Sequence, residues 1–236
     1  HLPLTIFHNN FYDSFMDYFN VNHHAFSNDK YTVWKSVYPP LTFIIAKIVT
    51  PEHCDNLSGL ILRKCGLFSY FIFFIPLYIS SVYLTYRFNL KFIKTLSFIN
   101  KFALIFIIAF SLPMFYLLER GNYLLIAYIF ILFFLLKNES IIMKNFFLAI
   151  ACNIKPYLIV LNLFDFVKKD YKKFTIGLFF PILIFIISFV ILNDENAINF
   201  IKNIFLFGGS EINKDAFNFT TSFESHFKFI KYIYDI

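Results

Sequence analysis

Long runs of apolar residues constrain the fold of this chain more than any other feature. A helix needs about 17–25 residues to cross the hydrocarbon core of a bilayer, and helices satisfy their own backbone hydrogen bonds in lipid. We predict that four runs, which meet or approach this length, cross a membrane as helices: Gly66–Tyr86, Phe102–Leu118, Tyr123–Leu136 and Phe174–Leu192.

The composition agrees with this interpretation and argues against a soluble protein. Hydrophobic residues make up 58% of the 236 residues, compared with about 45–50% in soluble domains. A soluble protein of this composition would expose large aggregation-prone patches. We therefore predict an all-α polytopic integral membrane protein. The net charge of +6 then serves membrane topology, and no nucleic-acid binding is expected.

Two further apolar runs are predicted not to span. Leu41–Val49 is too short and follows two prolines, which favours an interfacial or re-entrant helix. Asn145–Phe166 is long enough, but Lys155-Pro156 interrupts its middle. Proline breaks a helix, and a lysine at mid-bilayer costs about 2.5–3.5 kcal/mol. We predict a re-entrant pair of half-helices with its apex at Lys155-Pro156, with one kinked span as the alternative.

Lysine and arginine residues indicate the sidedness. They concentrate in Arg87–Lys101 and Val167–Lys173, and the positive-inside rule places such loops in the cytoplasm. The chain begins with His1, not Met, and ends in an aromatic, Lys-rich stretch, so we expect a fragment of a longer chain. The predicted parts are a first extracytoplasmic loop with interfacial helices (1–65), a transmembrane core (66–192) with the re-entrant segment near 145–166, and a truncated extracytoplasmic segment (193–236).

Several kinds of site are not indicated by the sequence. Histidine and cysteine spacings do not match a metal site, and no metal ligand is predicted. The chain shows no glycine-rich phosphate loop and no soluble nucleotide-binding domain of the Rossmann type. Cys54 and Cys65 could pair in an oxidising compartment, and two free thiols are an equally good interpretation.

Two carboxylates in the first outer loop are candidates for a general base. Asp13 and Asp17 lie four residues apart, so a helix would place them on one face. Partial burial among the neighbouring aromatic residues would raise the pKa of such a carboxyl group and suit it to accept a proton. Solvated loop acids or helix caps are the alternative.

Two basic residues are candidates for binding a phosphate. Arg120, in Glu119-Arg120-Gly121-Asn122, has a planar fork that can bind two oxygens, although an arginine at a helix end can also simply reach the interface. Lys155 lies within an apolar run, which makes it a functional candidate. Its ammonium could neutralise the phosphate of a lipid carrier, and a structural pairing with Glu119 is the alternative.

The order of these motifs resembles glycosyltransferase family 87, the mannosyltransferase-like group of the GT-C fold. That order is an outer-loop acid, Tyr38-Pro39-Pro40-Leu41, Arg120-Gly121-Asn122 and Lys155-Pro156, over about residues 13–166. The resemblance implies a GT-C-like helical bundle. It also implies a glycosyltransferase that moves a hexose, mannose-like, from a polyprenyl-phosphate sugar donor to a hydroxyl of a glycan or glycolipid acceptor, with inversion. The active site would face outward from the bacterial plasma (inner) membrane.

The resemblance also implies a role for each candidate residue. Asp17 matches the acid that deprotonates the acceptor, with Asp13 as the alternative, and Arg120 and Lys155 match positions near the donor phosphate. Members of the wider fold differ in their use of a divalent cation, so metal dependence stays open. A transporter or flippase for a lipid-linked or small amphiphilic substrate is the alternative function. The positions that would shape the pocket are Asn122 and Tyr38.

Overall fold

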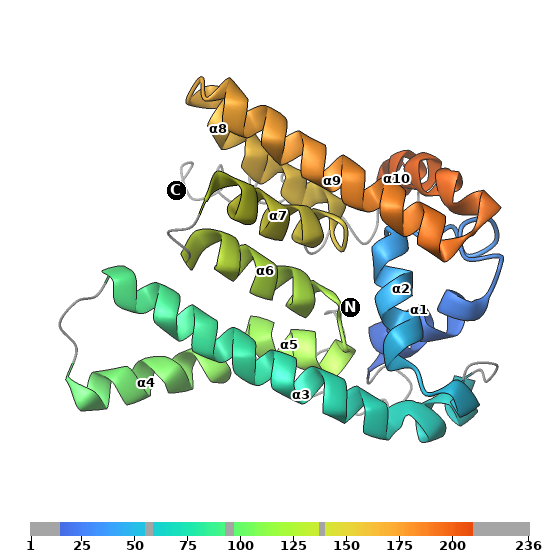
Figure 1. Ribbon diagram of the computed structural model, residues 1–236. Coiled ribbons are helices and arrows are strands. Elements are labelled where there is room, and N and C mark those ends of the chain that lie inside the picture. Colours follow the sequence, from blue (N-terminus) through green and yellow to red (C-terminus); the bar gives the residue numbers. More distant parts are fainter. Residues whose placement is uncertain (1–14, 55–58, 93–96, 137–139, 210–236) are drawn as a thin grey trace, which may run out of the picture.

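The computed structural model describes residues 15–54, 59–92, 97–136 and 140–209. Within these ranges the regular elements are all helices (Figure 1), so the predicted all-α fold is confirmed. The α-helices are α1 (Met16–Phe26), α2 (Pro40–Val49), α3 (Gly59–Phe92), α4 (Phe98–Ala109), α5 (Leu112–Arg120), α6 (Leu124–Leu136), α7 (Ile141–Cys152), α8 (Leu163–Val167), α9 (Tyr171–Leu192) and α10 (Asn199–Gly209). Short 3₁₀ helices are η1 (Glu52–Cys54), η2 (Pro156–Asn162) and η3 (Glu195–Ile198).

Helices α3 and α9 are the two described helices that are each long and apolar enough to cross a membrane, over Lys64–Leu90 and Tyr171–Leu192. They contain the first and last predicted spans. Each includes an internal proline, Pro76 in α3 and Pro181 in α9. Membrane helices tolerate proline because neighbouring groups satisfy the backbone that it disturbs. The Asn153 side chain, at the end of α7, donates to the Pro181 carbonyl in α9 at 3.0 Å.

The prediction of one continuous helix over Phe102–Leu118 is wrong. The chain forms α4 and α5 instead, bent by 43° at the break between them. Pro113 is the physical reason, because it lacks the backbone N–H that would bond the Ala109 carbonyl four residues earlier. The backbone is extended at Ser111, just before α5 begins. The Tyr78 hydroxyl donates to the Ala109 carbonyl at the end of α4, and the Ser111 hydroxyl donates to the Ile108 carbonyl at 3.0 Å.

The remaining core helices are shorter. Helix α6 packs between α3 and α7, and α7 packs on α9. Beyond α7 the chain turns at residues 153–155, and η2 and α8 run back alongside α7 to the start of α9 (Figure 1). The helical run therefore breaks at Lys155-Pro156. The depth of this pair in a membrane stays a prediction.

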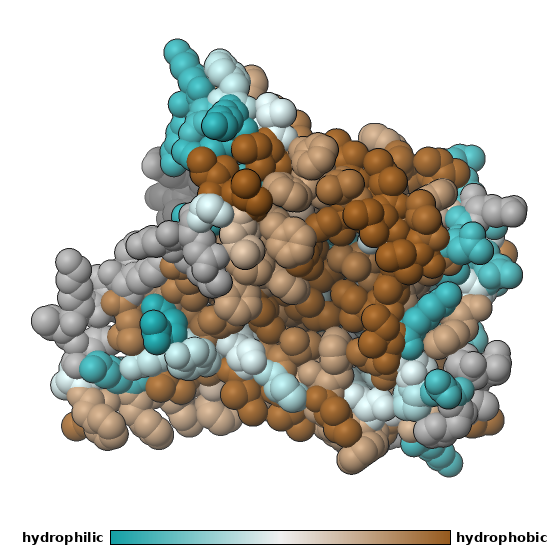
Figure 2. All heavy atoms as spheres, in the orientation of Figure 1, coloured by the Kyte–Doolittle hydropathy of each residue, from teal (hydrophilic) through white to brown (hydrophobic). Residues whose placement is uncertain are grey.

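Apolar side chains cover the middle of the molecule. Figure 2 shows hydrophobic residues across the centre of this face and hydrophilic residues toward both ends of the bundle. Large apolar side chains on the long helices are strongly exposed, including Phe68 of α3 and Val190 of α9. Such a belt suits contact with lipid.

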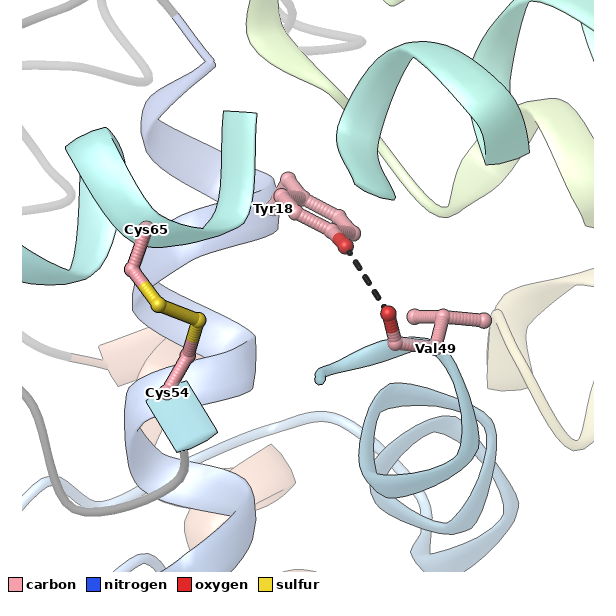
Figure 3. Close-up of a disulfide and its surroundings, with 4 residues drawn as sticks. All are labelled: Tyr18, Val49, Cys54 and Cys65. Atoms are coloured by element: carbon pink, nitrogen blue, oxygen red, sulfur yellow. Dashed lines mark hydrogen bonds between the residues drawn. A yellow bond between two sulfur atoms is a disulfide. The ribbon is translucent and has the colours of Figure 1, made fainter. Parts of the chain in front are cut away.

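Helices α1, α2 and α10 gather at one end of the bundle (Figure 1, right). An aromatic cluster joins α1 to the neighbouring helices, and in it Tyr18, Tyr70 and Tyr123 are fully buried. The Tyr18 hydroxyl donates to the Val49 carbonyl of α2 at 3.4 Å (Figure 3). The cluster fixes α1 against α3 and against the start of α6.

A disulfide joins Cys54 of η1 to Cys65 of α3 at the same end (Figure 3). The two Cα atoms are 5.9 Å apart, within the usual range for such a bond. Of the two interpretations that the sequence allowed, the structure has the paired one.

A buried ion pair connects the first loop to the last described segment. Lys30 Nζ lies 2.7 Å from Asp194 Oδ2, and the two side chains are only 3% and 5% exposed. Nearby, the Asn203 amide of α10 donates to the Tyr31 carbonyl at 2.9 Å and to the Ser36 carbonyl at 3.1 Å. Residues 30–36 are thus fixed to η3 and α10, although more than 150 residues separate them along the chain.

Candidate active site

Asp17 lies at the centre of a polar cluster at the α1 end of the bundle. One carboxylate oxygen, Oδ1, is 2.9 Å from Arg120 Nη2. The other, Oδ2, accepts a hydrogen bond from Asn122 Nδ2 at 2.7 Å. The Asp17 and Arg120 side chains are 17% and 13% exposed, so the pair is largely shielded from solvent. A short backbone bond from Phe15 N to the Glu119 carbonyl, 2.6 Å, brings the first turn of α1 to the end of α5.

The turn after α5 explains how Arg120 and Asn122 reach the same carboxylate. Gly121 caps α5 with a φ of 63°, in the left-handed region that favours glycine. A Cβ at this position would lie 2.7 Å from the Tyr18 Cβ, which leaves no room for a side chain. The Asn122 side chain also accepts from the Leu124 backbone N–H at 2.9 Å, which fixes the amide at the start of α6.

Lys155 joins the cluster from the turn between α7 and η2, outside the candidate spans. Its ammonium lies 4.4 Å from the centroid of the Tyr38 ring, which is a cation–π contact. Burial lowers the pKa of Lys155 to about 8, and the negative charge of Asp17 opposes this shift. Among the described residues, Lys155 forms no ion pair with a carboxylate.

The structure therefore brings together five of the six residues proposed from the sequence: Asp17, Tyr38, Arg120, Asn122 and Lys155. Asp13 lies outside the described residues. Two features suit the cluster to an anion. Lys155 is half-buried and has no carboxylate partner among the described residues, and Arg120 Nε is buried without a hydrogen-bond partner there. Burying such a donor unpaired is costly unless a ligand pairs with it.

Metal-type clusters and the cavity described below do not coincide with these residues. Among the described residues, no group of three or more His, Cys, Asp or Glu residues could hold a metal ion. A cavity of about 460 Å³ opens between α2 and α3, but no candidate residue lines it. Its walls are Ile48, Val49, Ser69, Ile72, Phe73, Pro76, Leu77 and Ser80.

Trp34 lies beside Tyr38 and was not among the residues proposed from the sequence. Trp34 stacks on Tyr38 with ring centroids 6.3 Å apart, and His24 stacks on Trp34 at 4.0 Å with an interplanar angle of 11°. The one usable signal was the presence of a single tryptophan in a chain rich in phenylalanine, four residues before Tyr38.

Comparison with known protein families supports the resemblance to glycosyltransferase family 87. A family model, Glycosyltransferase family 87, matches residues 37–234. Neither the curated proteins nor the solved structures gave a match. The matched region contains Tyr38, Arg120, Asn122 and Lys155 but begins after Asp17, so the assignment of Asp17 rests on the geometry described above. The chain, helical and rich in membrane-type helices, belongs to glycosyltransferase family 87, a family of membrane glycosyltransferases.

Proposed function

We propose that this protein transfers a hexose, mannose-like, from a polyprenyl-phosphate donor to a hydroxyl group of a glycan or glycolipid acceptor, with inversion at the sugar carbon. One observation carries the proposal. A shielded carboxylate, Asp17, lies beside two cations, Arg120 and Lys155, at one end of a membrane bundle. Acid–base chemistry and phosphate binding need these groups close together.

Arg120 and Lys155 are proposed to bind the donor phosphate. Transfer leaves negative charge on the departing polyprenyl phosphate, and fixed cations in a site that excludes water stabilise such charge best. Arg120 can offer the phosphate its unpaired Nε as well as the edge of its guanidinium that does not face Asp17. Lys155 supplies a second charge that no described carboxylate neutralises.

Asp17 is proposed to act as the general base. Each carboxylate oxygen keeps acceptor capacity beside the bond that it already accepts from Arg120 or Asn122. As the acceptor oxygen bonds to the anomeric carbon, its proton passes to Asp17 and the bond from that carbon to the phosphate oxygen breaks. Attack from the face opposite the leaving group inverts the configuration. Asn122 and Arg120 hold the carboxylate in position for this step, and Tyr38 shapes the pocket.

Two observations support an outward-facing site in the bacterial plasma (inner) membrane. The Cys54–Cys65 disulfide lies at the α1 end of the bundle, and disulfides persist in oxidising compartments outside the cytoplasm. The lysines of residues 168–173 lie at the opposite end, beside α8 (Figure 1), as the positive-inside rule expects for a cytoplasmic loop. Membership of a glycosyltransferase family favours this function over a transporter or flippase.

Sugar transfer in membranes that contain the protein tests the proposal. A panel of radiolabelled polyprenyl-phosphate sugars would be offered with endogenous glycolipid acceptors, and transfer by the natural protein compared with Arg120→Gln and Lys155→Ala. Asp165→Asn is the matched control, because Asp165 is a half-buried charged residue in α8, away from the cluster. We expect transfer from at least one donor, loss of at least tenfold in each cluster variant, and unchanged transfer in the control. No transfer from any donor would contradict the proposal.

A further inference from the structure

The aromatic contacts around Tyr38 form a continuous stack that ends at Lys155. His24, Trp34 and Tyr38 follow one another with interplanar angles of 11° and 22°. The Lys155 ammonium then lies over the Tyr38 ring. Within the described residues, Tyr38 is the aromatic ring that contacts this ammonium, so whatever fixes the Tyr38 ring also fixes the charge.

The Tyr38 ring is held chiefly by the loop that precedes it. Trp34 stacks on it from four residues earlier in the chain, and the Tyr31 hydroxyl donates to the Tyr38 carbonyl at 3.2 Å. Within this loop the backbone of Lys35 is in the left-handed region, with a φ of 51°. Non-glycine residues adopt this region at a cost that the surrounding structure must offset, so the loop conformation is imposed by its contacts.

Those contacts come from the far end of the described chain. The Asn203 amide bonds two carbonyls, those of Tyr31 and Ser36, which flank Trp34. The buried ion pair between Lys30 and Asp194 ties the start of the same loop to the start of η3. The η3–α10 segment thus holds the loop that carries Trp34, and Trp34 stacks on the Tyr38 ring.

We infer that Trp34 is a positioning residue, which sets the Lys155 ammonium for the donor phosphate by stacking on Tyr38. This inference rests on the proposed function and adds a residue that does not itself contact the reacting atoms. It predicts that Trp34 acts through Lys155 and through no other cluster residue. Loss of the ring would let Tyr38 and the ammonium above it move, which weakens binding of the donor more than that of the acceptor.

A double-mutant cycle tests this directly. Donor KM and kcat would be measured in membranes for the natural protein, Trp34→Ala, Lys155→Ala and the double variant. From the usual strength of a cation–π contact, we expect Trp34→Ala to raise the donor KM by about three- to tenfold. In the Lys155→Ala background the same change should alter the donor KM by less than about twofold. Val33→Ala is the matched control, since Val33 is 75% exposed in the same loop, and it should have no effect.

Two further variants keep the test decisive. Trp34→Phe retains a ring and should stay within about threefold of the natural donor KM. Asn203→Leu removes the two hydrogen bonds to the carbonyls of Tyr31 and Ser36 and should also raise the donor KM. This increase should vanish in the Lys155→Ala background. Equal effects of Trp34→Ala in both backgrounds would overturn the inference while leaving the proposed function intact. An unchanged donor KM in Lys155→Ala alone would instead contradict the proposed phosphate contact, and the inference would fall with it.

Discussion

Replacing Gly121 with alanine should disrupt the cluster around Asp17 strongly, because the turn at Gly121 has no room for a methyl group. Alanine in the left-handed region costs about 1–2 kcal/mol. The new Cβ would also lie 2.7 Å from the Tyr18 Cβ and 3.0 Å from the Tyr70 ring, far inside normal carbon contacts. Overpacking of this kind typically costs about 1–3 kcal/mol. We therefore expect a total destabilisation of about 2–5 kcal/mol, with Arg120 and Asn122 displaced from Asp17.

Thermal unfolding in detergent and sugar transfer in membranes would measure the two effects. For a chain of this size the melting temperature should fall by about 5–15 °C, and transfer should fall at least tenfold. Gly66→Ala is the comparison, because Gly66 lies within α3 and its added Cβ would meet one neighbour, Phe19 Cε1 at 3.0 Å, with no left-handed backbone to strain. It should destabilise the protein less than Gly121→Ala, and a Gly121→Ala protein with the natural melting temperature and full transfer would show that this turn does not constrain the cluster.

Three further predictions follow from individual contacts. Burial lowers the pKa of Lys155 to about 8, and the charged ammonium is the form present below that value. The kcat/KM for the donor should therefore fall as the pH rises through about 8. A flat profile from about pH 7 to about 9.5 would contradict the role of this charge. Reducing the Cys54–Cys65 disulfide, whose cysteines are 11 residues apart, should cost about 3 kcal/mol, seen as a lower melting temperature with reductant, and no change would show that the bond does not constrain the fold. Asp194→Asn leaves the Lys30 charge buried and should lower the free energy of unfolding by about 3–5 kcal/mol. Lys30→Met combined with Asp194→Leu removes both charges and should recover part of that stability. A double variant that melts below Asp194→Asn would contradict this prediction.

The sequence predicted the long helices well, because length and hydrophobicity alone decide whether a helix can cross a bilayer. It failed at Phe102–Leu118, where hydrophobicity continues through a break that Pro113 imposes. The rule that proline breaks a helix predicts the break at Lys155-Pro156 and explains the one before Pro113. Pro76 and Pro181 show why the rule is hard to use, since both lie inside unbroken helices.

The cluster could be predicted in part because three of its residues lie beside informative neighbours. A proline follows Tyr38 and Lys155, and a glycine follows Arg120. The Lys30–Asp194 pair and the bonds of Asn203 could not be predicted in this way, because each joins residues more than 150 positions apart and carries no local pattern. Pairing of Cys54 with Cys65 was likewise undecided, since spacing fixes neither geometry nor redox compartment.

If Asp17 removes the acceptor proton, as we propose, Asp17→Asn should abolish transfer without weakening the binding of the donor. Asp17→Asn keeps the size of the side chain and an oxygen for the hydrogen bond from Arg120 or Asn122, but it removes the base. Donor affinity and the rate of transfer at saturating donor would be measured for both proteins in membranes. We expect donor affinity within about threefold of the natural value and a transfer rate reduced by at least about 100-fold. An Asp17→Asn protein that transfers sugar at the natural rate would rule out Asp17 as the general base.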